Sequence, residues 1–254
     1  MIISPLNRLS AVGATNVNNN TAPIIVPSFN LPSALHEWNY ENATVVGTTT
    51  TVTDTGSIGL LDMANPSAIS QPVLTANELT FDGISQYIIK NTTNFRGSDA
   101  TGVFHAKGHY SGTDQYLFMA GDTSGSNAFI SFKIRSNGNV RLLYYSSVWN
   151  ILQTNLTIAS GTDFTVSVYG SGADVFIIIN GVKITSYSTN TILNRWLDYP
   201  IVTKGATVHN ISVSARVRTA IDYGVGSQKY VCYEPYTSEA DALTNHNTIR
   251  NTVF

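Results

Sequence analysis

The chain has 254 residues, enough for one large all-β domain or two small ones with a sizeable core. Charged residues make up only 12% and the formal net charge is -2 with no basic run, which argues against a coiled coil, nucleic-acid binding and anionic membranes. No apolar run approaches the ~18 residues of a transmembrane helix, and the single Cys232 excludes a disulfide framework or a Cys-based zinc site.

The first thirty residues differ in character from the rest of the chain. They show neither helical nor strand periodicity, and three prolines interrupt them, Pro5, Pro23 and Pro27. They also contain apolar residues that docking on a surface would order: Ile2, Ile3, Ile24, Ile25 and Val26. We expect residues 1–30 to form an extended arm, packed along its own domain or anchoring the chain to a partner, and residues 31–254 to form the domain. The segment lacks the sustained apolar core of a signal peptide, so none is expected.

From Leu35 onward, short β-branched or aromatic runs alternate with clusters of Gly, Asn, Asp and Ser, which is typical of all-β proteins. The clearest hairpin begins where Phe164, Val166 and Val168 alternate with other residues, and continues through a turn into the run at 175–179. Asn180-Gly181 tolerates positive φ and favours a tight type I′ turn, so a three-stranded antiparallel meander is predicted.

A second hairpin is predicted around the turn at 136–139. Ile130, Phe132 and Ile134 alternate with Ser131, Lys133 and Arg135 before this turn, and residues 140–146 return after it. Further strands are predicted at Leu79–Phe81, Tyr87–Lys90, Gly102–Gly108, Gln115–Ala120, Thr207–Val217 and Lys229–Tyr233. With roughly a dozen strands, a two-sheet antiparallel sandwich is the simplest architecture.

Only the C-terminus predicts a helix. Thr237 or Ser238 is a suitable N-cap for a short, peripheral helix, and Leu243 is expected to face the body of the domain.

Several motifs follow one another in a characteristic order. They are Asp54-Thr55-Gly56, Leu79-Thr80-Phe81-Asp82-Gly83 leading to Tyr87-Ile88-Ile89, the 175–184 hairpin with Asn180-Gly181, and Val231-Cys232-Tyr233 before Tyr236-Thr237-Ser238-Glu239-Ala240. In this order they resemble the concanavalin A-like family, in particular its laminin-G-like domains. The resemblance covers about residues 35–254 and implies a jelly-roll sandwich that binds glycans or proteins. Similar domains occur as modules of phage and other virion surface proteins.

Glycoside hydrolases share this fold, so the carboxylates bear on catalysis. A retaining hydrolase needs two carboxylates about 5 to 5.5 Å apart, whereas the glutamates here are scattered singly: Glu37, Glu41, Glu78, Glu234 and Glu239. Glu37 and Glu41, which flank Trp38 and Tyr40, are the nearest approach to a catalytic pair. No Gly-x-Ser-x-Gly elbow is present either. We expect no catalytic residue and no enzymatic activity.

Metal sites are also sparsely indicated. His105 and His109 fall in a predicted strand and turn, not on one helix face, and Cys232 is expected to be a small core residue. Laminin-G-like domains often carry a calcium ion, and the resemblance makes Asp114 and Asp122, or Asp163 with Asp174, calcium candidates. A turn role for Asp122 is favoured over ion binding. No other cofactor is expected.

Glycan binding needs flat aromatic faces together with amides, hydroxyls and acids. Three groups supply them, and their residues are Tyr144, Tyr145, Trp149 and Asn150; then Trp196, Asp198 and Tyr199; and finally Tyr110 with Tyr116. For each aromatic residue the alternatives are a place in the core, at a sheet edge or in an oligomer interface.

These features favour a non-enzymatic virion surface protein, a spike, fibre or decoration protein whose lectin-like sandwich recognises a host surface glycan. A homo-oligomer is expected, with residues 1–30 contacting a capsid or virion protein after synthesis in the host cytoplasm. The alternatives are a purely structural capsid-associated protein, a polysaccharide-active enzyme and a free carbohydrate-binding module.

Overall fold

The structure, a computed structural model, describes residues 29–59, 61–75, 78–91, 102–121, 129–146, 148–171, 174–192, 210–213, 215–217 and 221–252. The arm predicted for residues 1–30 lies outside these ranges except for its last two residues. Within the described ranges, no helix combines the length and the apolar character needed to cross a membrane.

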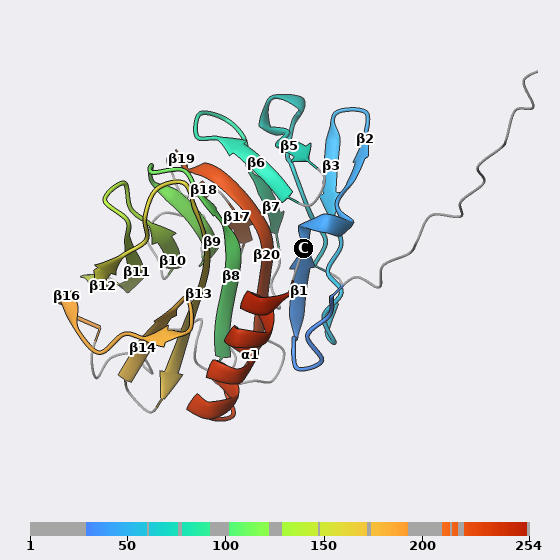
Figure 1. The fold of residues 1–254 in the computed structure, drawn as a ribbon. Helices are drawn as coiled ribbons and strands as arrows, with labels where there is room; N and C mark the ends of the chain where they lie inside the picture. The colour runs from blue at the N-terminus through green and yellow to red at the C-terminus, as the bar shows by residue number, and fades with distance from the viewer. Residues whose placement is uncertain are drawn as a thin grey trace, which may run out of the picture.

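Two large antiparallel sheets contain most of the described strands (Figure 1). One has eight strands: β1 (His36–Asn39), β5 (Val73–Thr75), β6 (Glu78–Asp82), β8 (Gly102–Tyr110), β13 (Thr162–Ser171), β14 (Asp174–Ile179), β15 (Val182–Lys183) and β20 (Val225–Pro235). The other has ten: β2 (Thr44–Val46), β3 (Thr49–Val52), β4 (Met63–Ala64), β7 (Ile88–Asn91), β9 (Gln115–Gly121), β10 (Phe129–Ile134), β11 (Asn139–Ser146), β12 (Val148–Thr157), β16 (Tyr187–Asn190) and β17 (Asn210–Val213). A separate hairpin joins β18 (Ala215–Val217) to β19 (Ile221–Tyr223).

The strand order confirms the predicted all-β sandwich. It is β15-β14-β13-β8-β20-β6-β5 in the eight-stranded sheet, where β1 also pairs with β20, and β16-β12-β11-β10-β9-β17-β7-β4-β3-β2 in the ten-stranded sheet. The single strand predicted at 207–217 is divided, because β17 joins the ten-stranded sheet and β18 joins the separate hairpin. Two short 3-10 helices, η1 (Tyr40–Asn42) and η2 (Ala68–Ser70), lie in the connections.

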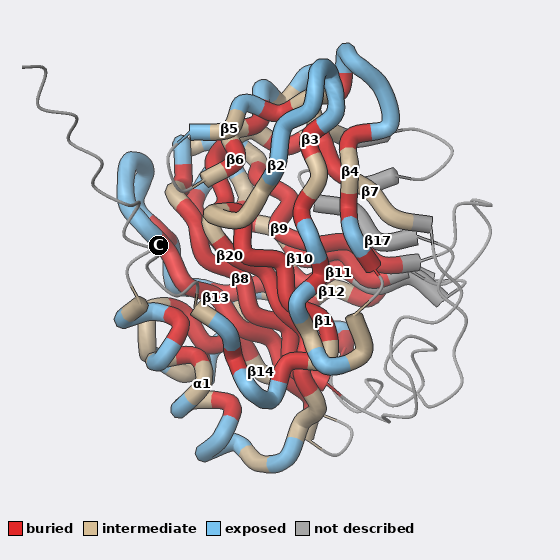
Figure 2. The backbone as a smooth tube through the Cα atoms, turned by 90° about the vertical axis from the view of Figure 1, so that its right-hand side faces the viewer, coloured by how far each residue is buried: buried red, intermediate tan, exposed pale blue. Residues whose placement is uncertain are grey.

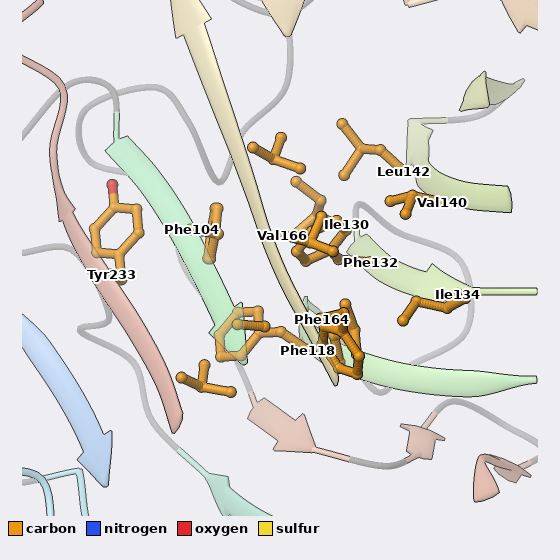
Figure 3. Packing of buried hydrophobic residues seen from close by; sticks show 14 of the residues in the cluster. Phe104, Phe118, Ile130, Phe132, Ile134, Val140, Leu142, Phe164, Val166 and Tyr233 are labelled. Carbon is orange, nitrogen blue, oxygen red and sulfur yellow. The ribbon is translucent and has the colours of Figure 1, made fainter. Parts of the chain in front are cut away.

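The main core lies between the two sheets, where buried backbone runs through the middle of the molecule (Figure 2). The predicted inward residues of β10 and β13 are all at most 2% exposed: Ile130, Phe132, Ile134, Phe164, Val166 and Val168. Phe104 of β8 packs against Phe118 and Tyr233, with ring centroids 5.0 and 4.8 Å apart, and so joins both sheets (Figure 3). Alternating apolar residues therefore build the core as the sequence predicts.

The predicted three-stranded meander is confirmed as β13, β14 and β15. At its second turn Asn180 has φ 49° and Gly181 φ 88°, the two positive values that a type I′ turn requires. The Asn180 side chain also accepts a hydrogen bond from the Thr165 backbone N–H at 2.8 Å, which fixes the turn against β13.

Helix α1 (Glu239–Asn251) covers the outer face of the eight-stranded sheet (Figure 1). Its N-cap is Ser238, one of the two predicted caps, whose hydroxyl accepts a hydrogen bond from the first helical turn. The buried helix residues are Ala242, His246 and Ile249, while Leu243, the predicted inward residue, is only partly buried. The helix therefore docks through a small and partly polar face.

The chain enters the described structure on the same outer face as α1. The ring of Phe29 packs edge-on against Tyr230 of β20, with centroids 5.5 Å apart. Leu31, Ala34 and Ile249 of α1 complete this cluster together with Cys232, which is buried as predicted. Residues 29–34 therefore pack on the eight-stranded sheet, next to the C-terminal half of the helix.

The Asp-Thr-Gly loop at 54–56, part of the family resemblance, packs against β1 and is hydrogen-bonded to it. Asp54 Oδ1 accepts backbone hydrogen bonds from Glu37 and Gly56, at 2.9 and 3.1 Å, and its Oδ2 lies 2.7 Å from His36 Nδ1. A Cβ at position 56 would lie 2.3 Å from the Leu35 carbonyl oxygen, so only glycine fits there. The motif is thus a structural requirement of this edge of the sheet.

Candidate functional site

A row of polar side chains crosses four neighbouring strands on the outer face of the ten-stranded sheet. In register, Tyr116 of β9 lies opposite Lys133 of β10, Lys133 opposite Arg141 of β11, and Arg141 opposite Gln153 of β12. Since successive strand residues point to opposite faces and the neighbours of this row belong to the main core, the row itself faces outward.

Three cations gather at this row, and we call Lys133, Arg135 and Arg141 the basic cluster. Lys133 Nζ donates to Asp114 Oδ2 at 2.5 Å and lies 4.7 Å from the centre of the Tyr116 ring. Arg141 donates from Nε and Nη2 to Gln153 Oε1, at 2.8 and 2.6 Å. Arg135 Nη1 reaches the same oxygen at 3.4 Å.

Burial and mutual repulsion both affect the charges of the basic cluster. Desolvation lowers the pKa of Arg141, and the charge of Arg135 lowers that pKa further. For Asp114, burial raises the pKa of the carboxyl group, but the hydrogen bonds from Lys133 and the Ser136 N–H and the charges of Lys133 and Arg135 together outweigh burial and lower that pKa. Asp114 is therefore held as an anion by the cation next to it.

An aromatic side chain lies further along the same face of β12. Trp149 is 47% exposed, and between it and Gln153 lies Ile151, which packs with Met119 and Leu143 in a small cluster outside the main core. The face thus combines an exposed indole with cationic and amide groups. These are the kinds of group that bind sugars.

Of the other members of this predicted aromatic group, the structure describes the side chain of Asn150 alone. Tyr144 and Tyr145 pair in the backbone with Asn150 and Trp149, respectively, and their side chains lie outside the described residues. Asn150 is 2% exposed. We therefore correct its predicted role beside Trp149, because adjacent strand positions face opposite sides and its side chain is buried.

The predicted platform of Tyr110 and Tyr116 is also corrected. Tyr110 is 1% exposed and its hydroxyl donates to the Arg135 carbonyl at 2.6 Å, whereas Tyr116 is 4% exposed beneath Lys133. A ring without an exposed face cannot stack on a sugar. Tyr110 instead lines one wall of a cleft of about 430 Å³ between three loops, with hydroxyl and amide groups from Ser111, Asn137 and Ser160.

The third predicted aromatic group and one of the calcium candidates fall outside the part of the chain that the structure describes. Trp196, Asp198, Tyr199 and Asp122 lie outside the described residues. Asp114 uses its two carboxylate oxygens for Lys133 and for the Ser136 backbone N–H. No group of three His, Cys, Asp or Glu side chains in the described ranges is placed to hold a metal ion.

The second calcium pair, Asp163 and Asp174, is separated by the length of β13. Asp163 pairs with His109 at one end of that strand, and Asp174 pairs with Ser171 at the other. The two carboxylates therefore cannot bind one ion.

The glutamates singled out for catalysis have structural partners. Glu37 accepts hydrogen bonds from the Leu31 backbone, the Tyr230 hydroxyl and, at 3.0 Å, the Thr55 hydroxyl, and burial raises the pKa of its carboxyl group. Glu41 donates its backbone N–H to the Asn39 side chain at the start of η1. Neither residue forms a paired carboxylate with the other.

A line of buried polar side chains runs between the eight-stranded sheet and α1. Gly181 N–H donates to His246 Nε2 at 2.9 Å, so the ring proton of neutral His246 is on Nδ1 and points to Ser167 Oγ, 2.7 Å away. Ser167 lies 2.6 Å from His105 Nδ1, and His105 Nε2 lies 2.8 Å from Glu234 Oε1. Each group donates to the next, and the line ends on the carboxylate.

This Ser, His and Glu arrangement was not singled out from the sequence, because its members come from β13, β8, β20 and α1. The side chains of His105 and Glu234 are 0% and 3% exposed, and Ser167 is fully buried. A substrate cannot reach this serine while α1 is docked. The line holds the helix to the sheet, and Ser33 and Asn245 also donate to Glu234.

Comparisons with known proteins bear on the fold. No protein-family model and no curated protein matches the chain. Among solved structures, the Trypanosoma rangeli sialidase in complex with sialic acid has a TM-score of 0.61 at 11% identity, covering 88% of this chain and 34% of its own. A Ruminococcus gnavus IT-sialidase CBM40 bound to alpha2,3 sialyllactose scores 0.47 at 13% identity, covering 59% and 83%, and a heptameric SAP-like pentraxin from Limulus polyphemus scores 0.41 at 11%, covering 65% and 82%.

The fold is a jelly-roll-like β-sandwich. The sialidase likeness, which involves about a third of that enzyme, agrees with the concanavalin A-like architecture expected from the sequence. At this level of identity, the likeness describes the fold alone.

Sequence reasoning missed the basic cluster, although one signal was present. Lys133 and Arg135 occupy the outward positions of the predicted hairpin, and Arg141 follows its turn. Pairing the two strands about that turn brings Lys133 opposite Arg141. The contribution of Gln153 needs the next strand, which was not predicted.

Proposed function

We propose that the chain is a glycan-binding module without enzymatic activity, and that its sugar site lies on the outer face of the ten-stranded sheet. The observation that carries the proposal is the joint presence on β12 of exposed Trp149 and, four residues on, Gln153 with its arginine partners. At 3.3 Å per residue the two positions are about 13 Å apart. An oligosaccharide that stacks on the indole can therefore bind the polar row with its hydroxyl groups.

The fold likeness supports the same proposal in a general way. The sialidase that shares this architecture forms a complex with sialic acid, so a sandwich of this type occurs within a protein that binds a sugar. The location proposed for the site comes from the side chains of this chain alone.

A glycan array followed by calorimetry on the best ligand tests the proposal. Trp149→Ala should weaken that ligand about tenfold, or ~1.4 kcal/mol, because the stacking face is lost. Val182→Ala is the matched control, since it removes an exposed apolar side chain from β15 in the other sheet and should leave affinity unchanged. Failure of the unmodified chain to bind any glycan on a broad array would contradict the proposal.

The absence of hydrolysis is part of the proposal. Asp114 is the carboxylate that contacts the basic cluster among the described residues, through Lys133, and glycoside hydrolysis needs two. A reducing-sugar assay on every glycan that binds should give no signal above background. Release of sugar that Glu37→Gln or Glu41→Gln abolishes would show an enzyme instead.

We further propose that the module is displayed on a virion surface as a spike, fibre or decoration protein, with residues 1–30 as its anchor. The support is the polar, proline-interrupted composition of that segment and its apolar residues, together with the place where residue 29 reaches the domain. Light scattering on the full chain and on a version starting at Leu31 tests this role. An oligomer that dissociates on truncation is expected, and a monomer in both cases would favour a free binding module.

A further inference from the structure

The basic cluster brings like charges into direct cross-strand contact. Lys133 and Arg141 are opposite each other in the β10–β11 register, and Arg135 follows Lys133 by two residues, just past the end of β10. Like charges placed directly opposite each other destabilise a sheet. The arrangement therefore costs the folded protein stability unless an anion lies nearby.

The anion that is present is already engaged. Asp114 pairs with Lys133 at 2.5 Å and accepts the Ser136 N–H at 2.7 Å. Lys133 is thereby neutralised, but neither arginine forms an ion pair with a described carboxylate. The three cations of the basic cluster therefore share one carboxylate, and the cluster keeps an excess of positive charge in a chain whose formal net charge is -2.

The hydrogen bonds of the two arginines are also incomplete. Each guanidinium group has five N–H donors, yet both direct their described hydrogen bonds to one neutral oxygen, Gln153 Oε1. Arg135 Nε is buried and has no partner among the described residues. This donor is closed to solvent, so an oxygen-bearing anion can meet the two arginines only through terminal N–H groups that Gln153 does not take.

We infer that Arg135 and Arg141 bind the carboxylate of an acidic sugar, while the neighbouring sugar rings extend along β12 toward Trp149. A planar carboxylate matches the donor fork of a guanidinium group, and paired arginines supply two such forks. The inference rests on the proposed glycan site and names its ligand class. It makes the acidic group the determinant of specificity and the indole a general stacking surface.

Calorimetry on the full chain with a matched pair of probes, 3′-sialyllactose and lactose, tests the inference, and glucuronic acid provides a second carboxylate. The unmodified chain should bind the acidic trisaccharide at least tenfold more tightly than lactose. Arg141→Gln should reduce this ratio to near one, because glutamine keeps an amide donor but loses the charge. Lys183→Gln is the control, since it removes an exposed charge from the other sheet and should leave the ratio unchanged.

The outcomes separate the inference from the proposed function. Equal affinity for the acidic and the neutral sugar overturns the inference and leaves glycan binding intact. Binding of sodium sulfate or phosphate without binding of any sugar overturns both and identifies an inorganic-anion site. If Arg141→Gln does not fold, Arg135→Gln provides the same comparison. Removal of either charge should also raise the melting temperature of the ligand-free protein, a result that a purely stabilising arginine would not give.

Discussion

Acidification from about pH 7.5 to about pH 5 should destabilise the protein through His246, and replacing this residue should remove that effect. His246 is fully buried between α1 and β13. Desolvation lowers the pKa of its imidazole to about 3, and the positive charge of Arg250 adds to this shift. Protonation would also break the hydrogen bond that Nε2 accepts from Gly181.

The sign and the size follow from proton linkage. The folded-state pKa of His246 lies below the ordinary value of 6.5, so between these two values the unfolded chain binds more protons, and stability falls as the pH is lowered. A pH of about 5 lies about 1.5 units below the pKa of the imidazole in the unfolded chain. Proton binding to the unfolded chain then lowers the free energy of unfolding by about 2 kcal/mol. Any folded-state pKa below about 4 gives nearly the same loss, so the result depends little on the depth of the shift.

Urea unfolding followed by the fluorescence of the three tryptophans measures this loss at both pH values. His246→Gln should flatten the pH dependence by about 2 kcal/mol relative to the unmodified chain. Subtracting the variant from the unmodified chain removes the other titrating groups, including Glu37, whose raised pKa acts with the opposite sign. Equal acid losses in the unmodified chain and in His246→Gln would refute the reasoning.

Three further substitutions test the packing around the two sheets. Gly56→Ala should lower stability by roughly 1 to 3 kcal/mol in urea unfolding, because the new Cβ would lie 2.3 Å from the Leu35 carbonyl oxygen; an unchanged midpoint would contradict this. Ser238→Ala removes the acceptor of the Asp241 N–H and should cost about 1 kcal/mol, with Ser238→Asp restoring it. Lys107→Met removes three hydrogen bonds, to the carbonyl groups of Ile249 and Arg250 in α1 and of its C-cap Thr252, and should speed amide exchange in that helix. Equal amide-exchange rates for α1 in Lys107→Met and in the unmodified chain would contradict the last expectation.

Local periodicity predicted the central strands and their turns because each signal lies within about twenty residues. Asn180-Gly181 has the positive φ values that its residue types favour. The same alternation leaves Thr165 and Ser167 unexplained, since both face away from the core and are nevertheless buried. Helix α1 covers them from more than seventy residues away, through His246 instead of an apolar stripe.

In the candidate site, too, the features set by neighbouring residues were predictable from the sequence, and the contacts between distant segments were not. The outward positions of β10 are visible in the sequence, but their meeting with Gln153 depends on a strand that lacks clear alternation. Tyr110 and Tyr116 were misassigned for a related reason. Composition alone does not tell an exposed ring from one that a neighbouring strand and a lysine cover.

The two outer faces of the sandwich are not equivalent, and this gives the domain a direction. Helix α1 and residues 29–34 occupy the outside of the eight-stranded sheet, whereas the basic cluster lies on the outside of the ten-stranded sheet. If the chain is attached to a surface through the segment before Phe29, helix α1 would therefore face that surface. The arginines would then point outward into the medium, oriented by the way the chain is attached.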